Sequence, residues 1–204
     1  EENKILKLDT ALNVLWTKQI APAIYEIQTS SNGYVYSCGI FQGIEDFDPS
    51  PTNSFFLTGS GSLNFFIQKL DTAGNFVWAK AIISTGGSNN YAYGLSISSF
   101  EDVSLVGRIT GTIDANPDSL NTYNIASAGA DDAFVVVLDS LGNFKSAATF
   151  GSVAGNETFR TTHFTASNEL IVGGEFYNTI DVNPTAGTTN ITSNGQSDFF
   201  MLNL

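Results

Sequence analysis

The feature that most constrains this sequence is an internal repeat. Residues 65–80 read FFIQKLDTAGNFVWAK, and similar segments occur at residues 4–18 and 133–145, with a shorter one at residues 198–204. A Leu-Asp pair marks the three longer copies, and its aspartates Asp9, Asp71 and Asp139 are 62 and 68 residues apart. Self-similarity at a regular period indicates a fold in which copies of one supersecondary unit stack on each other.

A second motif recurs between the copies of the first. It reads GIFQGIEDFDP at residues 39–49, GRITGTIDANP at residues 107–117 and GEFYNTIDVNP at residues 174–184. The prolines of the three copies are 68 and 67 residues apart. Because two unrelated motifs keep the same period, chance is a poor explanation for either of them.

Each period reads as four β-strands with no helical periodicity. Apolar residues alternate over residues 91–98, which is typical of a strand with one buried face. The remaining strands are expected at residues 103–113, 132–138 and 144–150, with a polar loop at 118–131 and a tight turn at 139–143. The run Phe134–Leu138 is apolar on both faces, as expected for an inner strand.

Four short strands repeated at fixed spacing are typical of the blades of a β-propeller. We therefore predict an all-β fold of consecutive four-stranded antiparallel blades, as a partial propeller or a fragment of a longer one. The expected units are a partial blade at residues 1–20, blades at 21–82 and 83–151, and an incomplete blade at 152–204. Trp16 and Trp78 are expected to fill the space between blades, whereas the third copy has Ser146 at that position.

The charge balance excludes some classes of partner. Twenty acidic and eight basic residues give a formal net charge of −12. Nucleic-acid backbones and anionic membrane surfaces would be repelled, and no run approaches the ~18 apolar residues of a membrane-spanning helix. We therefore expect neither nucleic-acid binding nor membrane insertion. Cys38 is the only cysteine and is expected to be a buried, inert thiol.

Two of the motifs together resemble a known family. The segment Phe66–Lys80, with GTIDANP at residues 111–117, is similar to the SBBP-type β-propeller repeat of large secreted and surface proteins of bacteria, Bacteroidota among them. The resemblance covers nearly the whole chain. It implies an extracellular or cell-surface, multi-repeat, non-enzymatic protein, often exported by the type 9 secretion route.

The second motif contains a candidate calcium site in each copy. Oxygen ligands two residues apart in a turn suit Ca²⁺, although a full site needs more ligands than these. The alternative interpretation, which we favour, is an Asx-turn that ends a strand, with proline blocking further pairing. The candidate ligands are Asp46 and Asp48, Asp114 and Asn116, and Asp181 and Asn183.

A short Asp-(Ser/Thr)-(Ala/Leu) pattern occurs four times. It resembles the O-glycosylation motif of exported Bacteroidota proteins, and three of the copies fall in expected hairpin turns. Ordinary turn chemistry explains the same pattern, because Asp and Thr side chains cap hairpins. The candidate acceptor residues are Thr10, Thr72, Ser119 and Ser140.

No catalytic constellation is recognisable in the sequence. His163 is the only histidine and lies in an expected strand without identifiable triad or metal-binding partners. Asp131 and Asp132 are adjacent on a strand and are expected to point to opposite faces, which suits no glycosidase pair. Gly86-Gly87-Ser88 lacks the lysine and the helix of a phosphate loop.

Three functions remain open at this stage. The leading hypothesis is a non-enzymatic scaffold or adhesion module, bound to a protein or glycan partner at the cell surface or to further repeats. The second is a carbohydrate-binding module, with or without calcium, in which exposed tyrosines stack on sugars. The candidate tyrosines are Tyr91, Tyr93, Tyr123 and Tyr177. The third is part of a propeller enzyme whose site lies outside this segment.

Overall fold

The structure is a computed structural model that describes residues 3–20, 22–87, 89–185 and 187–204. The described residues form β-strands joined by turns, with no helix and therefore no helix able to cross a membrane. The expectation of an all-β fold is confirmed. The strands are β1 (Asn3–Leu8), β2 (Val14–Ile20), β3 (Ala23–Thr29), β4 (Val35–Phe41), β5 (Ile44–Asp46), β6 (Phe56–Thr58), β7 (Asn64–Leu70), β8 (Phe76–Ser84), β9 (Tyr91–Ile97), β10 (Val103–Ile109), β11 (Thr112–Asp114), β12 (Asn124–Ala126), β13 (Asp132–Leu138), β14 (Phe144–Phe150), β15 (Thr158–Phe164), β16 (Leu170–Phe176), β17 (Thr179–Asp181), β18 (Asn190–Thr192) and β19 (Asp198–Asn203).

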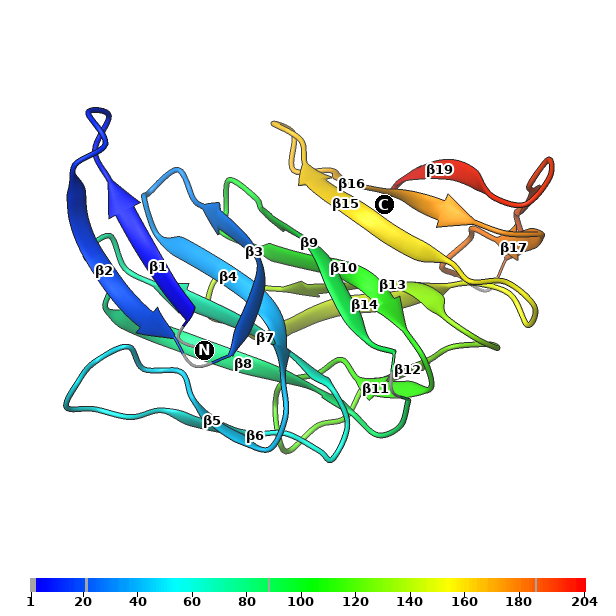
Figure 1. Cartoon of the computed structure of the whole chain (residues 1–204). Helices are drawn as coiled ribbons and strands as arrows, with labels where there is room; N and C mark the ends of the chain where they lie inside the picture. The colour runs from blue at the N-terminus through cyan, green and yellow to red at the C-terminus, as the bar shows by residue number, and fades with distance from the viewer. Residues whose placement is uncertain (1–2, 21, 88, 186) are drawn as a thin grey trace.

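The strands pair antiparallel into sheets of different sizes. Strands β9, β10, β13 and β14 form a four-stranded sheet, and β3, β4, β7 and β8 are extended by β11 and β12 into a six-stranded one. Strands β15, β16 and β19 form a three-stranded sheet, while β1–β2, β5–β6 and β17–β18 are separate hairpins. Figure 1 shows β1 and β2 at one end of the molecule and β15 to β19 at the other.

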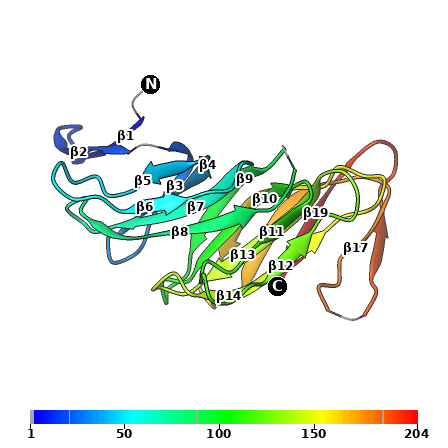
Figure 2. The same cartoon turned by 90° about the horizontal axis from the view of Figure 1, so that it is seen from below.

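The prediction of consecutive four-stranded blades was therefore wrong: among the described strands one sheet has four strands, and the others have two, three or six. The strand expected at residues 103–113 was wrong, because β10 ends at Ile109 and the chain turns at Gly111, whose φ is +81°. Strand β11 then leaves that sheet and pairs with β8 of the preceding one, Ile113 opposite Ser84. The expected polar loop at residues 118–131 contains β12, which completes the small hairpin with β11 (Figure 2).

The hydrophobic core lies between successive sheets, and β13 demonstrates this. Phe134, Val136 and Leu138 belong to a buried cluster shared with β4, β7 and β8. Val135 and Val137 of the same strand belong to a second cluster, shared with β15, β16 and β19. Since neighbouring strand residues point to opposite faces, one face of this sheet is covered by the preceding sheet and the other by the following one.

Tryptophans also connect successive repeats. The indole Nε1 of Trp16 donates to the carbonyl oxygen of Thr72 at 3.2 Å, and that of Trp78 donates to the carbonyl oxygen of Ser140 at 3.1 Å. Each acceptor lies in the hairpin turn of the next repeat. Both tryptophans also pack against the buried clusters at these contacts. The copies are thus held together by matching contacts, as expected for stacked units.

Candidate binding surface

The first strand of each repeat contains a β-bulge at the same position. The pairing register shifts so that Tyr25 of β3, Tyr93 of β9 and Arg160 of β15 have no partner on the neighbouring strand. Strand β9 contacts both β3 and β15, so the three bulges lie on adjacent strands (Figure 1). Bulges redirect side chains and are over-represented next to functional sites.

A glycine opposite each bulge makes this geometry possible. A Cβ on Gly39, Gly107 or Gly174 would lie 1.9 Å from a backbone oxygen of the bulged strand. These glycines open the three copies of the second sequence motif. Their recurrence therefore has a steric cause, because only glycine allows this approach of the two backbones.

Three tyrosines form a row across the first strands. The Tyr25 and Tyr91 rings are 6.3 Å apart at 16°, and the Tyr91 and Tyr93 rings are 5.8 Å apart at 14°. These rings and Ala92 line a hollow of about 370 Å³. Tyr25 is 42% exposed, and partial burial raises the pKa of its hydroxyl, so this group stays a hydrogen-bond donor at neutral pH.

Both arginines of the chain stack on this tyrosine row. The guanidinium of Arg108 lies 4.8 Å from the centre of the Tyr91 ring, and that of Arg160 lies 4.7 Å from the centre of the Tyr93 ring. Cation–π contacts of this kind hold planar donors at fixed positions beside aromatic faces. We call Tyr25, Tyr91, Tyr93, Arg108 and Arg160 the tyrosine–arginine row.

Acidic and amide groups fix the orientation of the arginines. Arg108 Nη1 lies 3.3 Å from Asp131 Oδ2, and Nη2 donates to Asn89 Oδ1 at 3.0 Å. Arg160 Nε lies 3.6 Å from Glu175 Oε1 on the half-exposed side of the row. The row therefore offers aromatic surface together with both donors and acceptors, which is the chemistry that binds polar, ring-shaped ligands.

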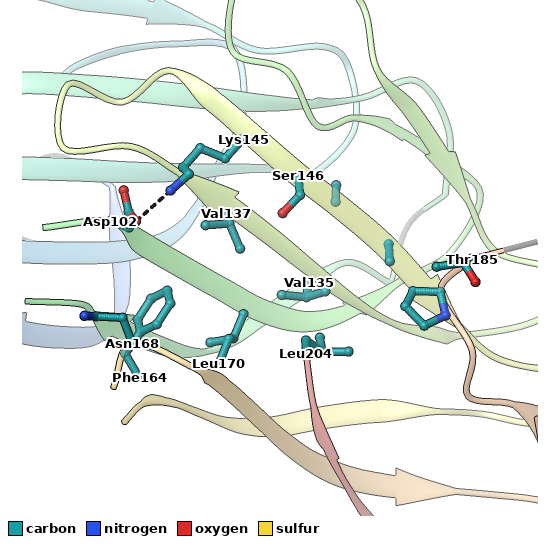
Figure 3. Close-up of a pocket in the computed structure, with 13 residues that line it drawn as sticks. Asp102, Val135, Val137, Lys145, Ser146, Phe164, Asn168, Leu170, Thr185 and Leu204 are labelled. Carbon is teal, nitrogen blue, oxygen red and sulfur yellow. Dashed lines mark hydrogen bonds and ion pairs between the residues drawn. The ribbon is translucent and has the colours of Figure 1, made fainter. Parts of the chain in front are cut away.

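A separate groove lies beside the last sheet. It has a volume of about 430 Å³ between β13–β14 and the sheet of β15, β16 and β19 (Figure 3). Val135, Val137, Leu170 and Leu204 line its apolar part, and the ion pair of Lys145 Nζ with Asp102 Oδ2, 2.7 Å long, lies at its edge.

The groove exists because small residues replace large ones. The register of β7–β8 and β13–β14 aligns Trp78 with Ser146 and Lys69 with Val137. Trp78 and Lys69 both reach the Ser140 carbonyl of the next repeat. Ser146 and Val137 are too short for an equivalent contact, so the space above them stays open.

The expected calcium ligands lie in three matching hairpins. Oδ1 of Asp46, Asp114 and Asp181 accepts the backbone N–H two residues later, at 3.0, 3.1 and 3.0 Å, and a second N–H across the hairpin. Asp48, Asn116 and Asn183 likewise accept an N–H two residues later. These are Asx-turns, as the alternative interpretation expected.

The turns already engage Oδ1 of each residue proposed as a calcium ligand. The N–H bonds from Thr189 and Asn183 lower the pKa of Asp181, and N–H bonds from Phe55 and Asp48 outweigh burial to lower that of Asp46. In the described part of the chain, no three His, Cys, Asp or Glu side chains lie where they could hold a metal ion. Calcium binding at these hairpins stays a prediction.

The expected O-glycosylation acceptors lie at turns. Thr10, Thr72 and Ser119 are exposed, while Ser140 is half-buried. In the hairpins of Thr10, Thr72 and Ser140, the preceding aspartate accepts N–H groups two and four residues beyond it, so Asp9, Asp71 and Asp139 build the turn. Turn formation alone explains the recurring aspartate, and glycosylation stays a prediction.

The residues considered for catalysis are not assembled into a site. His163 is exposed on β15. Asp131 pairs with Arg108, while Asp132 is buried and accepts the N–H of Ala128. Cys38 is a buried free thiol, and burial raises its pKa, which keeps the thiol protonated and unreactive.

Of the four tyrosines considered for sugar stacking, the structure brings together Tyr91 and Tyr93. Tyr123 instead packs on Phe144, with ring centres 4.7 Å apart, and the backbone N–H of Tyr177 bonds to Glu157. Tyr25 and both arginines were not among the residues predicted from the sequence. The glycine of the second motif was the available signal, because it marks the strand opposite each bulge.

Comparison of the chain with protein-family models and with curated proteins gives no match.

Proposed function

We propose that the chain is a non-enzymatic, extracellular interaction module built from β-propeller blades. The single observation that carries this proposal is the tyrosine–arginine row, which spans the first strands of three successive repeats. Tyr25, Tyr93 and Arg160 of this row come from equivalent bulges, so the row is a feature of the repeat and not of one loop. Repeat proteins present binding surfaces in this way.

The propeller arrangement is supported by the strand order and the cores. Strands β9, β10, β13 and β14 pair in a simple meander, and both faces of that sheet pack on neighbouring sheets. Strand β19 occupies the position of β7 and β13 but, among the described strands, pairs with β16 alone, and its residues Phe199 and Met201 are 64% and 68% exposed. The free edge and exposed face of β19, together with the groove of Figure 3, support the proposal that a further repeat is a partner of this chain.

Carbohydrate is the ligand class that fits the row best. Sugar rings present C–H groups on one face and hydroxyls around the edge, so they need an aromatic surface flanked by donors and acceptors. Tyr25 and Tyr91 supply the surface, Arg160 the donors and Glu175 the acceptors. The net charge of −12 disfavours strongly anionic glycans.

A glycan array followed by calorimetry tests the proposal. We expect the wild-type chain to bind neutral or weakly charged glycans, with Tyr25→Ala weakening the affinity about tenfold through loss of one aromatic contact of ~1.4 kcal/mol. Tyr123→Ala is the matched control, because Tyr123 is 45% exposed but lies outside the row. An array without hits, or equal losses in the two variants, would contradict carbohydrate binding at this row.

A further inference from the structure

The two junctions between full repeats differ in one buried set of side chains. In the first junction these residues are Asn64, Ser84 and Asn90. Strand register and chain position make Asp132, Ser152 and Glu157 their equivalents in the second junction. Two buried amides have thus become two buried carboxyl groups, with Asp132 2% and Glu157 0% exposed.

The side chains of the first junction, which we call the amide junction after Asn64 and Asn90, are fully hydrogen-bonded. Asn64 Nδ2 donates to the carbonyl oxygen of Ser62 at 2.8 Å and, at 3.3 Å, to that of Phe41. Its Oδ1 accepts the N–H of Ser84 at 3.1 Å. Asn90 Nδ2 in turn donates to Ser84 Oγ at 2.9 Å. Both amide NH₂ groups therefore supply donors that the surrounding backbone and hydroxyl groups require.

The second junction, which we call the carboxyl junction after Asp132 and Glu157, lacks these amide donors. Asp132 Oδ2 accepts the N–H of Ala128 at 2.8 Å, but within the residues that the structure describes neither the buried Oδ1 nor Ser152 Oγ has a hydrogen-bond partner. The Ser152 N–H turns instead to Glu157 Oε2 at 3.0 Å, and the other oxygen of Glu157 accepts the N–H of Tyr177 at 3.3 Å. Asp132 Oδ1 therefore stands where the first junction has the amide nitrogen of Asn64. An ionised carboxylate oxygen at this place has no hydrogen to donate.

We propose that Asp132 binds a proton on Oδ1, so that the second junction is held by a neutral carboxylic acid and loosens when this proton is lost. Protonated, Asp132 has a donor at the position of Asn64 Nδ2, which in the first junction bonds to the carbonyl oxygens of Ser62 and Phe41. Ionised, it leaves a buried negative charge on a carboxylate that one N–H group, from Ala128, stabilises, which is strongly unfavourable. Glu157 is the weaker candidate for the proton, because both of its oxygens accept N–H groups.

The neighbouring charges also favour a protonated Asp132. Asp131 lies beside Asp132 on the chain, and its own carboxylate is engaged by Arg108, so this arginine does not compensate Asp132. Burial first, and then the charge of Asp131, raise the pKa of Asp132 above its ordinary value of 3.8, and burial together with Asp132 raises that of Glu157.

The sign of the pH effect follows from these directions. The unfolded chain releases the Asp132 proton near pH 3.8, while the folded chain keeps it to a higher pH. Between these two values the unfolded state binds fewer protons, so the contribution of this group to stability falls as the pH rises. Above the pKa of Asp132 in the folded chain, the stabilising contribution of its proton is fully lost and no longer changes with pH.

Asp132→Asn, which restores the amide of the first junction, tests the proposal. We expect Tm of the variant to exceed that of the wild type by roughly 3 °C at pH 8, with the difference shrinking towards pH 4. The reciprocal Asn64→Asp should create the same pH dependence at the first junction. In the unmodified chain, ¹³C NMR should show the Asp132 carboxyl titrating above the exposed aspartates.

Three outcomes would overturn the proposal. One is a Tm difference between Asp132→Asn and the wild type that is the same at pH 4 and pH 8. Another is an Asp132 carboxyl that titrates with the exposed aspartates. The third is a rise in Tm with CaCl₂ in the wild type but not in Asp132→Asn, which would assign the unpartnered oxygen to a cation instead of a proton.

Discussion

Strands at equivalent positions have very different surroundings in the middle and at the ends of the molecule. All seven residues of β7 and of β13 are buried, whereas β1 and β19 each bury one residue and expose two apolar ones. The sequences of these strands are similar, and their neighbours are not: β7 and β13 each pair with two strands, and β1 and β19 with one. Burial is therefore set by the adjacent sheet more than by the strand itself.

A matched pair of phenylalanines gives the largest expected contrast. Phe65 of β7 and Phe199 of β19 occupy the same position of the repeat, but Phe65 is fully buried against Phe134 and Phe199 is 64% exposed. Phe65→Ala should reduce the free energy of unfolding by about 4 kcal/mol, through lost burial and a cavity. Phe199→Ala should change it by less than ~0.5 kcal/mol.

Urea denaturation of both variants measures this contrast. The unmodified chain provides the reference, and the slope of the transition reports whether unfolding stays cooperative. A loss for Phe199→Ala as large as that for Phe65→Ala would mean that β19 is covered in solution. Such a result would point to self-association, which light scattering would detect.

The turns before the second strand of each repeat give a second contrast. Gly33, Glu101 and Asn168 are equivalent, and all have a positive φ. Glu101 reaches back into the preceding repeat, where its carboxylate binds Lys69 Nζ at 2.6 Å, and Tyr36, Ser30 and Asn32 donate to it. Asn168 also reaches back, to the N–H and hydroxyl of Ser99, at an exposed site.

Glu101→Gln should cost about 3 kcal/mol, because it leaves the Lys69 ammonium buried without its counter-charge. Burial would raise the pKa of Glu101, but the hydrogen bonds from Lys69, Asn32 and Ser30 outweigh it and lower the pKa below 4.5. The unfolded chain therefore takes up this proton first, and the contribution of Glu101 to stability is lost as the pH falls below that value.

Asn168→Ala is the matched change at the end of the molecule and should cost less than ~1 kcal/mol. Thermal unfolding between pH 3 and pH 7 measures both variants. The Glu101→Gln variant should lose most at neutral pH and approach the wild type in acid. Equal losses of stability in the two variants would show that the buried contact in the middle of the chain contributes no more than the exposed contact at its end.

The sequence predicted the parts of the fold that depend on local pattern. The strands expected at residues 132–138 and 144–150 are confirmed, and that at 91–98 is one residue too long. The break at Gly111 was missed, because TIDANP reads as a continuing strand and only its pairing with β8 shows otherwise. Hydrophobic alternation reports which residues are buried but not which strand they pair with.

The candidate site was harder to predict for a related reason. A bulge is a change of register between two strands, so the sequence of one strand does not encode it. Tyr91 and Tyr93 were named from their exposed aromatic character, but Tyr25 comes from another repeat and Arg108 from another strand. The buried carboxyl groups are clearer once the copies are aligned, because Asp132 stands where Asn64 stands one repeat earlier.

The smallest expected effect concerns the hairpin turns of the first motif. Gly74 and Gly142 have φ values of +76° and +79°, and the equivalent residue in the first copy is Leu12, with φ +65° and 76% exposure. A left-handed conformation strains a leucine and not a glycine, and Leu12 buries little surface in return. Leu12→Gly should therefore raise the free energy of unfolding by about 1 kcal/mol, measured by urea denaturation.

Leu141→Gly is the control, since Leu141 is an exposed leucine of an equivalent turn and does not itself have a positive φ. That change should destabilise the chain by about 0.5–1 kcal/mol, through the greater freedom of glycine in the unfolded state. Opposite signs for the two variants would assign the strain of Leu12 to its backbone. A third outcome is that Leu12→Gly leaves the free energy of unfolding unchanged while Leu141→Gly lowers it as expected. The first hairpin would then unfold independently of the rest, and the β1–β2 end would be the less stable part of the molecule.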